Sequence, residues 1–170
     1  RREATKILRA TPDLRPAPTL PTLRRGMAWA STRSTVAADL YRKQFRALVQ
    51  LSAATITCDG SVGYPIRKFF EIPSLGRPVV AKFFPGAINL GFRAGVNCLE
   101  ASDPADLPDL VRSIKAESEW AQSIAECGQN LIWSKHRISH RVDQIVFVCS
   151  QLELDRSSTF IWSEGDLMVN

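Results

Sequence analysis

The chain has 170 residues, enough for one domain or for one domain with part of another. Hydrophobic residues make up 45% of it and charged residues 23%, the balance of an ordinary globular protein that can bury a core. No apolar run approaches the roughly 20 residues that a transmembrane helix needs, so we predict no transmembrane segment. Because the chain begins with Arg1 rather than Met, we expect its native start to lie upstream.

The net charge of +5 is unevenly distributed. Residues 1–46 hold eleven Lys and Arg against three acids, a balance of +8, whereas the remainder has a balance of −3. Such a segment is either a basic arm for nucleic acid or a membrane, or an Arg-rich surface or domain edge. It contains no glycine–arginine repeat, so we favour the second interpretation and predict no nucleic-acid partner.

The four cysteines contain no Cys-x-x-Cys pair, and their even number leaves disulfides open. We favour free thiols in a reduced, cytoplasmic protein.

The spacing of apolar residues and the positions of glycine and proline predict the helices and strands, which we take in chain order. Four prolines within ten positions predict an extended linker over 11–22, and a short strand over 27–30 follows in an ambiguous stretch. The polar tail from Asp155 is expected to fray. We predict helices over 1–10, 35–51, 66–75, 117–134 and 138–153, and a further helix that opens at Asp103-Pro104 with an apolar stripe through Ile114. We predict strands over 53–58, 78–81 and 96–100.

This alternation predicts an α/β fold, a Rossmann-like, mostly parallel sheet flanked by helices. We divide the chain into a basic, proline-rich segment over 1–34, an α/β domain over 35–154 and a tail over 155–170. In such sheets ligands bind outside the carboxyl ends of the strands. The loop over 59–65, between a strand and a helix, is therefore the predicted site.

The residues after this strand suit a nucleotide diphosphate. Glycines at 60 and 63 let the backbone approach a ligand, and Ser61 can hydrogen-bond within the loop. Arg67 and Lys68 bring positive charge to the start of the helix, where backbone amides also favour anions. Glu71, one turn on, can accept two hydrogen bonds from ribose hydroxyls. We therefore assign donor binding to Gly60, Ser61, Gly63, Arg67, Lys68 and Glu71.

The alternative for the charged pair is a surface salt bridge between Arg67 and Glu71 at helical spacing, worth under ~1 kcal/mol. Pro73 also removes an amide donor from the short helix, at a cost of about 3 kcal/mol unless something compensates.

Residues 67–76 (RKFFEIPSLG) resemble the R-x-F-E-I-P-A-x-G stretch of spore-maturation-type glycosyltransferases, members of the GT-B group of two Rossmann-like domains. Four later segments are similar to that family in the same order, so the resemblance covers roughly 40–141. These segments are 89–97 (NLGFRAGVN), 103–114 (DPADLPDLVRSI), 124–129 (IAECGQ) and 136–141 (HRISHR).

The resemblance implies the C-terminal half of a GT-B enzyme, with Glu71 on the donor ribose, Arg67 near its phosphates and Pro73 as a family feature. Many GT-B enzymes have a further glutamate eight residues before the ribose-binding one, where this chain has Gly63. The resemblance therefore implies neither that acidic residue nor retaining chemistry. In the family the acceptor and catalytic base come mainly from an N-terminal domain, so we assign no catalytic residue here.

Other site patterns are weaker. His136 and His140 have the spacing of a zinc pair but no third ligand nearby, so we favour capping or packing roles. The loop around Ser61 meets neither the nucleophile-elbow nor the P-loop pattern. Three tryptophans and an aromatic pair are interpreted as packing residues or interface anchors. These are Trp120, Trp133, Trp162 and the pair Phe83 and Phe84.

The sequence thus predicts a hexosyltransferase-like enzyme domain that binds a nucleotide sugar, with no metal or other cofactor and with a glycan, protein or small-molecule acceptor. As a fragment it is expected to be inactive alone. The alternative is a non-catalytic α/β interaction module, or a decayed transferase-like domain, whose basic N-terminal segment binds an acidic partner.

Overall fold

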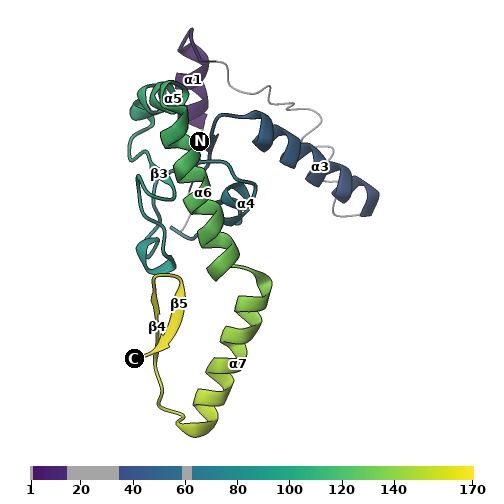
Figure 1. Ribbon diagram of the computed structural model, residues 1–170, viewed down its shortest axis with the longest axis vertical. Coiled ribbons are helices and arrows are strands. Elements are labelled where there is room, and N and C mark those ends of the chain that lie inside the picture. The colour runs from purple at the N-terminus through teal and green to yellow at the C-terminus, as the bar shows by residue number, and fades with distance from the viewer. Residues whose placement is uncertain (1, 15–34, 59–62) are drawn as a thin grey trace.

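The computed structural model of the protein describes residues 2–14, 35–58 and 63–170. The extended linker and short strand expected between 15 and 34, and the glycine loop over 59–62, lie outside the described residues. Figure 1 shows an elongated molecule with helix α6 along its middle, helix α3 projecting to one side, and helix α7 with a hairpin at the lower end.

Three short parallel strands form the sheet, in the order β1-β2-β3. Their bounds are β1 Thr55–Ile56, β2 Val79–Ala81 and β3 Leu99–Glu100. Thr55 pairs with Val79, and Val80 pairs with Leu99. The predicted parallel sheet is confirmed, although each hydrogen-bonded strand is shorter than the apolar run that predicted it.

The alternation along β2 gives the protein two cores, one on each face of the sheet, because successive strand side chains point to opposite faces. Val79 and Ala81 belong to the first core, whereas Val80 belongs to the second. The same split recurs at Cys98 and Leu99. The first core also contains Val49, Phe69, Ile72, Phe84, Ala87, Phe92 and Ile132, and the second Ala101, Leu107, Ile114, Ala121 and Ile124.

The helices begin and end close to the predicted positions. The α-helices are α1 Arg2–Ala10, α3 Thr35–Leu51, α4 Lys68–Ser74, α5 Leu107–Ala116, α6 Ser118–Lys135 and α7 Ile138–Leu154. Two 3₁₀ turns, η1 Ile88–Leu90 and η2 Pro104–Asp106, lie between α4 and α5. Asp103 caps η2, and its carboxylate accepts a hydrogen bond from the amide of Ala105 at 2.8 Å. The predicted helix start at Asp103–Pro104 thus falls on η2, one turn before α5.

Small residues bring α6 close to α4. A Cβ on Gly128 would stand 2.6 Å from the carbonyl oxygen of Asn97 and 3.3 Å from the Cβ of Pro73. Pro73 itself is buried near the end of α4. Packing against α6 therefore offsets part of the cost of a proline inside this short helix.

Helix α1 packs on the second core through Ala4 and Leu8. The segment after it is held by an ion pair in which Arg112 of α5 contacts Asp13 at 2.9 Å. The Arg112 guanidinium lowers the pKa of the Asp13 carboxyl. Residues 2–14 thus form part of the surface of the α/β domain.

The C-terminal tail does not fray, and that expectation is wrong. Residues 160–163 (β4 Phe160–Ser163) pair antiparallel with β5 Asp166–Val169. An isolated two-stranded hairpin is marginal in water. This one is tethered, because the amide of Gly165 donates to the carbonyl of Asn89 at 2.9 Å and Lys135 contacts Asp166 at 2.6 Å.

Candidate functional site

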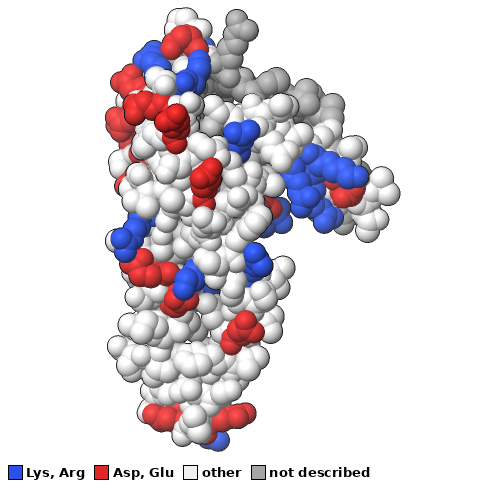
Figure 2. Space-filling view, in the orientation of Figure 1, with Lys and Arg blue, Asp and Glu red and all other residues white. Residues whose placement is uncertain are grey.

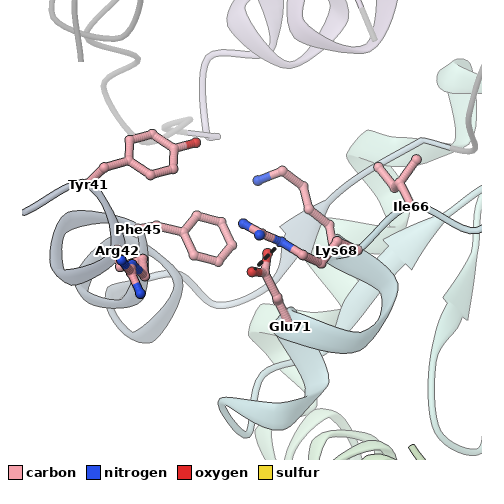
Figure 3. A pocket seen from close by; sticks show the side chains of 7 residues that line it. Tyr41, Arg42, Phe45, Ile66, Lys68 and Glu71 are labelled. Atoms are coloured by element: carbon pink, nitrogen blue, oxygen red, sulfur yellow. Dashed lines mark ion pairs between the residues drawn. The ribbon is translucent and has the colours of Figure 1, made fainter. Parts of the chain in front are cut away.

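A recess between α3 and α4 contains all three charged residues that the sequence assigned to donor binding. It is lined by Tyr41, Arg42, Phe45, Ile66, Arg67, Lys68 and Glu71, which we call the α3–α4 recess. Figure 3 shows the α3 side chains on one wall, facing Ile66, Lys68 and Glu71 on the other. Its volume is about 200 Å³. That is below the roughly 300–1,000 Å³ of ordinary small-molecule pockets, so a nucleotide sugar would extend beyond it.

A cation–π contact joins the two walls. The Nζ of Lys68 lies 4.1 Å from the centre of the Phe45 ring. Phe45 also packs against the first core, which fixes the ring on one side. Lys68 therefore both brings positive charge into the recess and helps to hold α3 beside α4.

Glu71 forms the salt bridge that was the simpler interpretation of its spacing. Its Oε1 lies 2.7 Å from Nε of Arg67, and the two side chains are 32% and 76% exposed. A pair this exposed contributes well under ~1 kcal/mol to stability. A carboxylate has two oxygens, so the ion pair leaves Glu71 the chemical capacity to accept further hydrogen bonds.

The first turn of α4 is already hydrogen-bonded. The amide of Phe69 donates to the carbonyl of Ile66, and the amides of Phe70 and Glu71 donate to that of Arg67, all at 3.0 Å. These three amides are engaged within the turn. The formal positive charge in the recess comes from side chains.

The balance of charge in the recess favours an anion. Three cations, Arg42, Arg67 and Lys68, line it with one carboxylate, that of Glu71. Figure 2 shows Lys and Arg gathered over α3, beside the region where α3 and α4 face each other. An excess of positive charge in a recess attracts a phosphorylated ligand more strongly than the same charge on a flat surface does.

The structure brings together three of the six residues assigned to the donor. Arg67, Lys68 and Glu71 line the recess, whereas Gly63 is outside its lining. Gly63 has φ of 66°, and a Cβ there would stand 3.2 Å from Cδ of Pro85, so a side chain would be strained at this position. Gly60 and Ser61 lie outside the described residues.

Tyr41, Arg42 and Phe45 are lining residues that the sequence analysis did not assign to the site. Phe45 is one of the apolar residues that recur at helical spacing over 35–51, and this spacing was the available signal. These residues come close to Arg67 only because α3 packs beside α4, which brings together residues more than twenty positions apart in the chain. Nothing in the local pattern of either helix encodes that contact.

The segment over 89–97 has a structural role. Asn97 is buried, donates from Nδ2 to the carbonyl of Gly91 and accepts at Oδ1 from the amide of Arg93, both at 2.8 Å. Gly91 and Gly95 have φ of 82° and 75°, values that favour glycine. Asn97 therefore holds this loop closed with two hydrogen bonds.

His136 joins α6, η1 and α7. Its ring lies parallel to that of Phe92 with centroids 5.9 Å apart, and its Nε2 is 2.8 Å from the carbonyl of Leu90. A neutral ring that donates from Nε2 leaves Nδ1 to accept from Arg141, which contacts it. Burial lowers the pKa of His136. His140 accepts from the amide of Arg137, so the predicted capping and packing roles are confirmed.

Phe83 and Phe84 pack against the first core, as predicted. Among the tryptophans, Trp120 packs against the second core and Trp162 lies under the guanidinium of Arg141 at 4.7 Å. Trp133 is about half exposed beside Arg137.

The four cysteines are free thiols. Burial raises the pKa of Cys98 to about 12, which keeps it protonated and unreactive. Within residues 2–14, 35–58 and 63–170, no group of three or more His, Cys, Asp and Glu side chains is placed to hold a metal ion. In the same part of the chain no helix is long and apolar enough to cross a membrane.

Comparison with known proteins identifies the family. The family model described as glycosyl transferase-like matches residues 4–146, most of the chain. The protein therefore belongs to the glycosyl transferase-like family. No curated protein and no solved structure matches the chain.

The family and the fold agree. A parallel sheet with helices on both faces is the Rossmann-like arrangement that the sequence predicted, and it fits the C-terminal half of a GT-B-type glycosyltransferase. The family match ends within α7, so the second half of that helix and the hairpin lie beyond it.

Proposed function

We propose that this domain binds a nucleotide-activated sugar in the α3–α4 recess, for transfer of its glycosyl group. One observation carries the proposal: in a chain of the glycosyl transferase-like family, three cations and one carboxylate line a single recess together with two aromatic side chains. The cations suit a diphosphate, and the carboxylate suits vicinal hydroxyls of ribose.

Each side chain has a distinct task in this proposal. Arg67 and Lys68 compensate the charge of the diphosphate, and Arg42 approaches the same anion from α3. Glu71 accepts hydrogen bonds from the ribose while it remains paired with Arg67. Stabilising the departing nucleotide diphosphate in this way favours transfer, because negative charge grows on it in the transition state.

The finer assignment is also a proposal. The similarity of residues 67–76 to spore-maturation-type enzymes supports that branch of the GT-B group and a hexosyl donor. The catalytic base and the acceptor site would then belong to a second domain, and we expect this chain to bind donor without turnover by itself.

Calorimetric titration with UDP, GDP and ADP tests donor binding. We expect one of the three to bind and Glu71→Ala to weaken that binding about tenfold or more, since hydrogen bonds to a charged group contribute about 1.5–3 kcal/mol. Glu119→Ala is the matched control, because Glu119 is an exposed acid in the first turn of α6, away from the recess. If the folded wild-type protein binds none of the three, donor recognition is wrong.

A second candidate is a non-catalytic module that binds an acidic partner. The cations Arg42, Lys43 and Arg46 on α3 favour it, although Lys43 is paired with Asp39 at 3.0 Å. Such a protein would bind acidic polymers with a steep dependence on salt, and nucleotides no more tightly than inorganic phosphate.

A further inference from the structure

Helix α7 has a continuous apolar seam that the rest of the described chain does not cover. Its members are Ile138, Val142, Ile145, Cys149 and Leu152, which we call the α7 seam. Ile138 is 84% exposed and Ile145 is 63% exposed, and α7 buries no residue at all. On the face shown in Figure 2, charged side chains gather at the two ends of the region where α7 lies, and the surface between them is largely uncharged.

The hairpin contacts α7 at two places. The ring of Phe147 lies 6.2 Å from that of Phe160 in β4. The second contact, Arg141 over Trp162, lies at the flank of the seam, because Arg141 precedes Ile145 by four positions, about 40° around the helix. Phe147 follows Ile145 by two positions, about 200° around the helix, and so lies opposite the seam. The hairpin therefore leaves the seam exposed.

The spacing of the seam is that of a coiled coil. Its residues follow one another at intervals of four, three, four and three positions, the alternation of a and d positions in a heptad. Such a seam is matched by another helix with the same spacing, and α7 of a second copy has that spacing.

The charges on α7 determine which way a second copy would run. At its N-terminal end Arg137 and Arg141 outnumber Asp143. At its C-terminal end Glu153 and Asp155 outnumber Arg156, so the two ends differ in the sign of their net charge. Each net charge opposes the helix's own dipole, at a cost of a few tenths of a kcal/mol to about 1 kcal/mol. An antiparallel neighbour places each end beside opposite charge, whereas a parallel neighbour places like charges together.

We infer that α7 is a homodimerisation helix, which pairs antiparallel with α7 of a second copy through the α7 seam. In this arrangement Val142 of one copy packs against Leu152 of the other, and Ile145 packs against Cys149. The inference is independent of donor binding, because the seam and the α3–α4 recess involve different helices. The seam is short, so the dimer should be weak.

Sedimentation of the whole chain tests the association. We expect the weight-average mass to rise from monomer towards dimer as the protein concentration is raised through the micromolar range, because small interfaces associate weakly. Ile145→Glu should weaken the association at least tenfold, and Val142→Lys should do the same. Ser150→Glu is the matched control, since Ser150 is an exposed α7 residue outside the seam and should leave the equilibrium unchanged. Circular dichroism checks that each variant folds.

Disulfide trapping tests the direction, in a background with Cys58→Ser and Cys127→Ser. One protein keeps Cys149, and the other carries Ile145→Cys with Cys149→Ser. The antiparallel pair predicts cross-linked dimers when the two proteins are mixed, and few with either alone, because a disulfide needs Cα atoms within about 7 Å. A chain that stays monomeric, a dimer that survives Ile145→Glu, or cross-linking mainly by each protein alone would overturn the inference.

Discussion

Helices α6 and α7 are nearly equal in length, at 18 and 17 residues, but they are packed very differently. Five residues of α6 are buried, and α7 has none. The buried set in α6 is Ala121, Ile124, Ala125, Gly128 and Ile132. Three of these are small, which lets α6 approach α4 and the sheet closely enough to close both cores. Helix α7 has larger apolar residues that face outward.

This comparison teaches that apolar content alone does not determine how deeply a helix is buried. Helix α6 lies against a sheet and another helix, so its packing fixes the two cores. Helix α7 lies against a hairpin through a few ring contacts. Stability should therefore depend strongly on residues around α6 and weakly on residues of α7.

The largest expected difference is between two phenylalanines. Phe69 is fully buried beside Phe84 and Phe92. Phe69→Ala should therefore lower the free energy of unfolding by about 3–5 kcal/mol. Phe147→Ala in α7 should cost only about 1 kcal/mol, because its ring is partly exposed and has one aromatic partner. Urea unfolding of both variants measures the difference. Equal losses would show that the hairpin and α7 are as tightly packed as the cores.

Gly128→Ala should destabilise the protein by about 1–3 kcal/mol, because the new Cβ would overlap the carbonyl oxygen of Asn97. The sign is informative, since alanine in place of glycine inside a helix normally stabilises it by up to about 1 kcal/mol. Ser150→Ala on α7 is the control and should change stability by less than about 0.5 kcal/mol. A stabilising Gly128→Ala in thermal unfolding would contradict the close approach of α6 and the 91–97 loop.

The smallest expected change in the free energy of unfolding is its pH dependence through His136, at the junction of α6 and α7. Burial lowers the pKa of His136, and Arg141, His140 and Asp166 are the charged groups that act on it. The unfolded chain then binds more protons than the folded one below the ordinary value of 6.5, so stability falls as the pH drops through that window. Protonation would also place an N–H of His136 against the guanidinium of Arg141.

Unfolding measured between pH 7 and pH 5 checks this dependence. His136→Gln keeps a donor for the carbonyl of Leu90 but cannot titrate, so it should flatten the curve. His140→Gln retains His136 and should keep the slope. A wild-type slope that His136→Gln leaves unchanged would assign the dependence to other groups.

Much of the fold follows from local patterns. Apolar periodicity with glycine and proline at the ends predicts the helices, and β-branched runs predict the strands. The strands are shorter than those runs because hydrogen-bonded pairing, rather than propensity, ends them. The hairpin is missed because Glu164 occupies its turn with φ of 52°, a conformation more typical of asparagine or aspartate.

The candidate site is predicted only in part. The α4 side follows from the order of Arg67, Lys68 and Glu71 after a glycine loop. The α3 side depends on how one helix packs on another, which no local spacing determines. The engaged amides of α4 are likewise visible only in the folded backbone.

One measurement tests donor recognition most directly: a thermodynamic cycle that combines Glu71→Gln with removal of the ribose 2′-hydroxyl. The ribonucleoside diphosphate that binds best is compared with its 2′-deoxy form on wild-type and variant protein. Wild type should prefer the ribose form about tenfold, and Glu71→Gln should abolish that preference, because hydrogen bonds to a carboxylate contribute about 1.5–3 kcal/mol. Equal affinity of wild type for both forms, unchanged by Glu71→Gln, would contradict the role of Glu71 as the ribose ligand and leave it as the salt-bridge partner of Arg67.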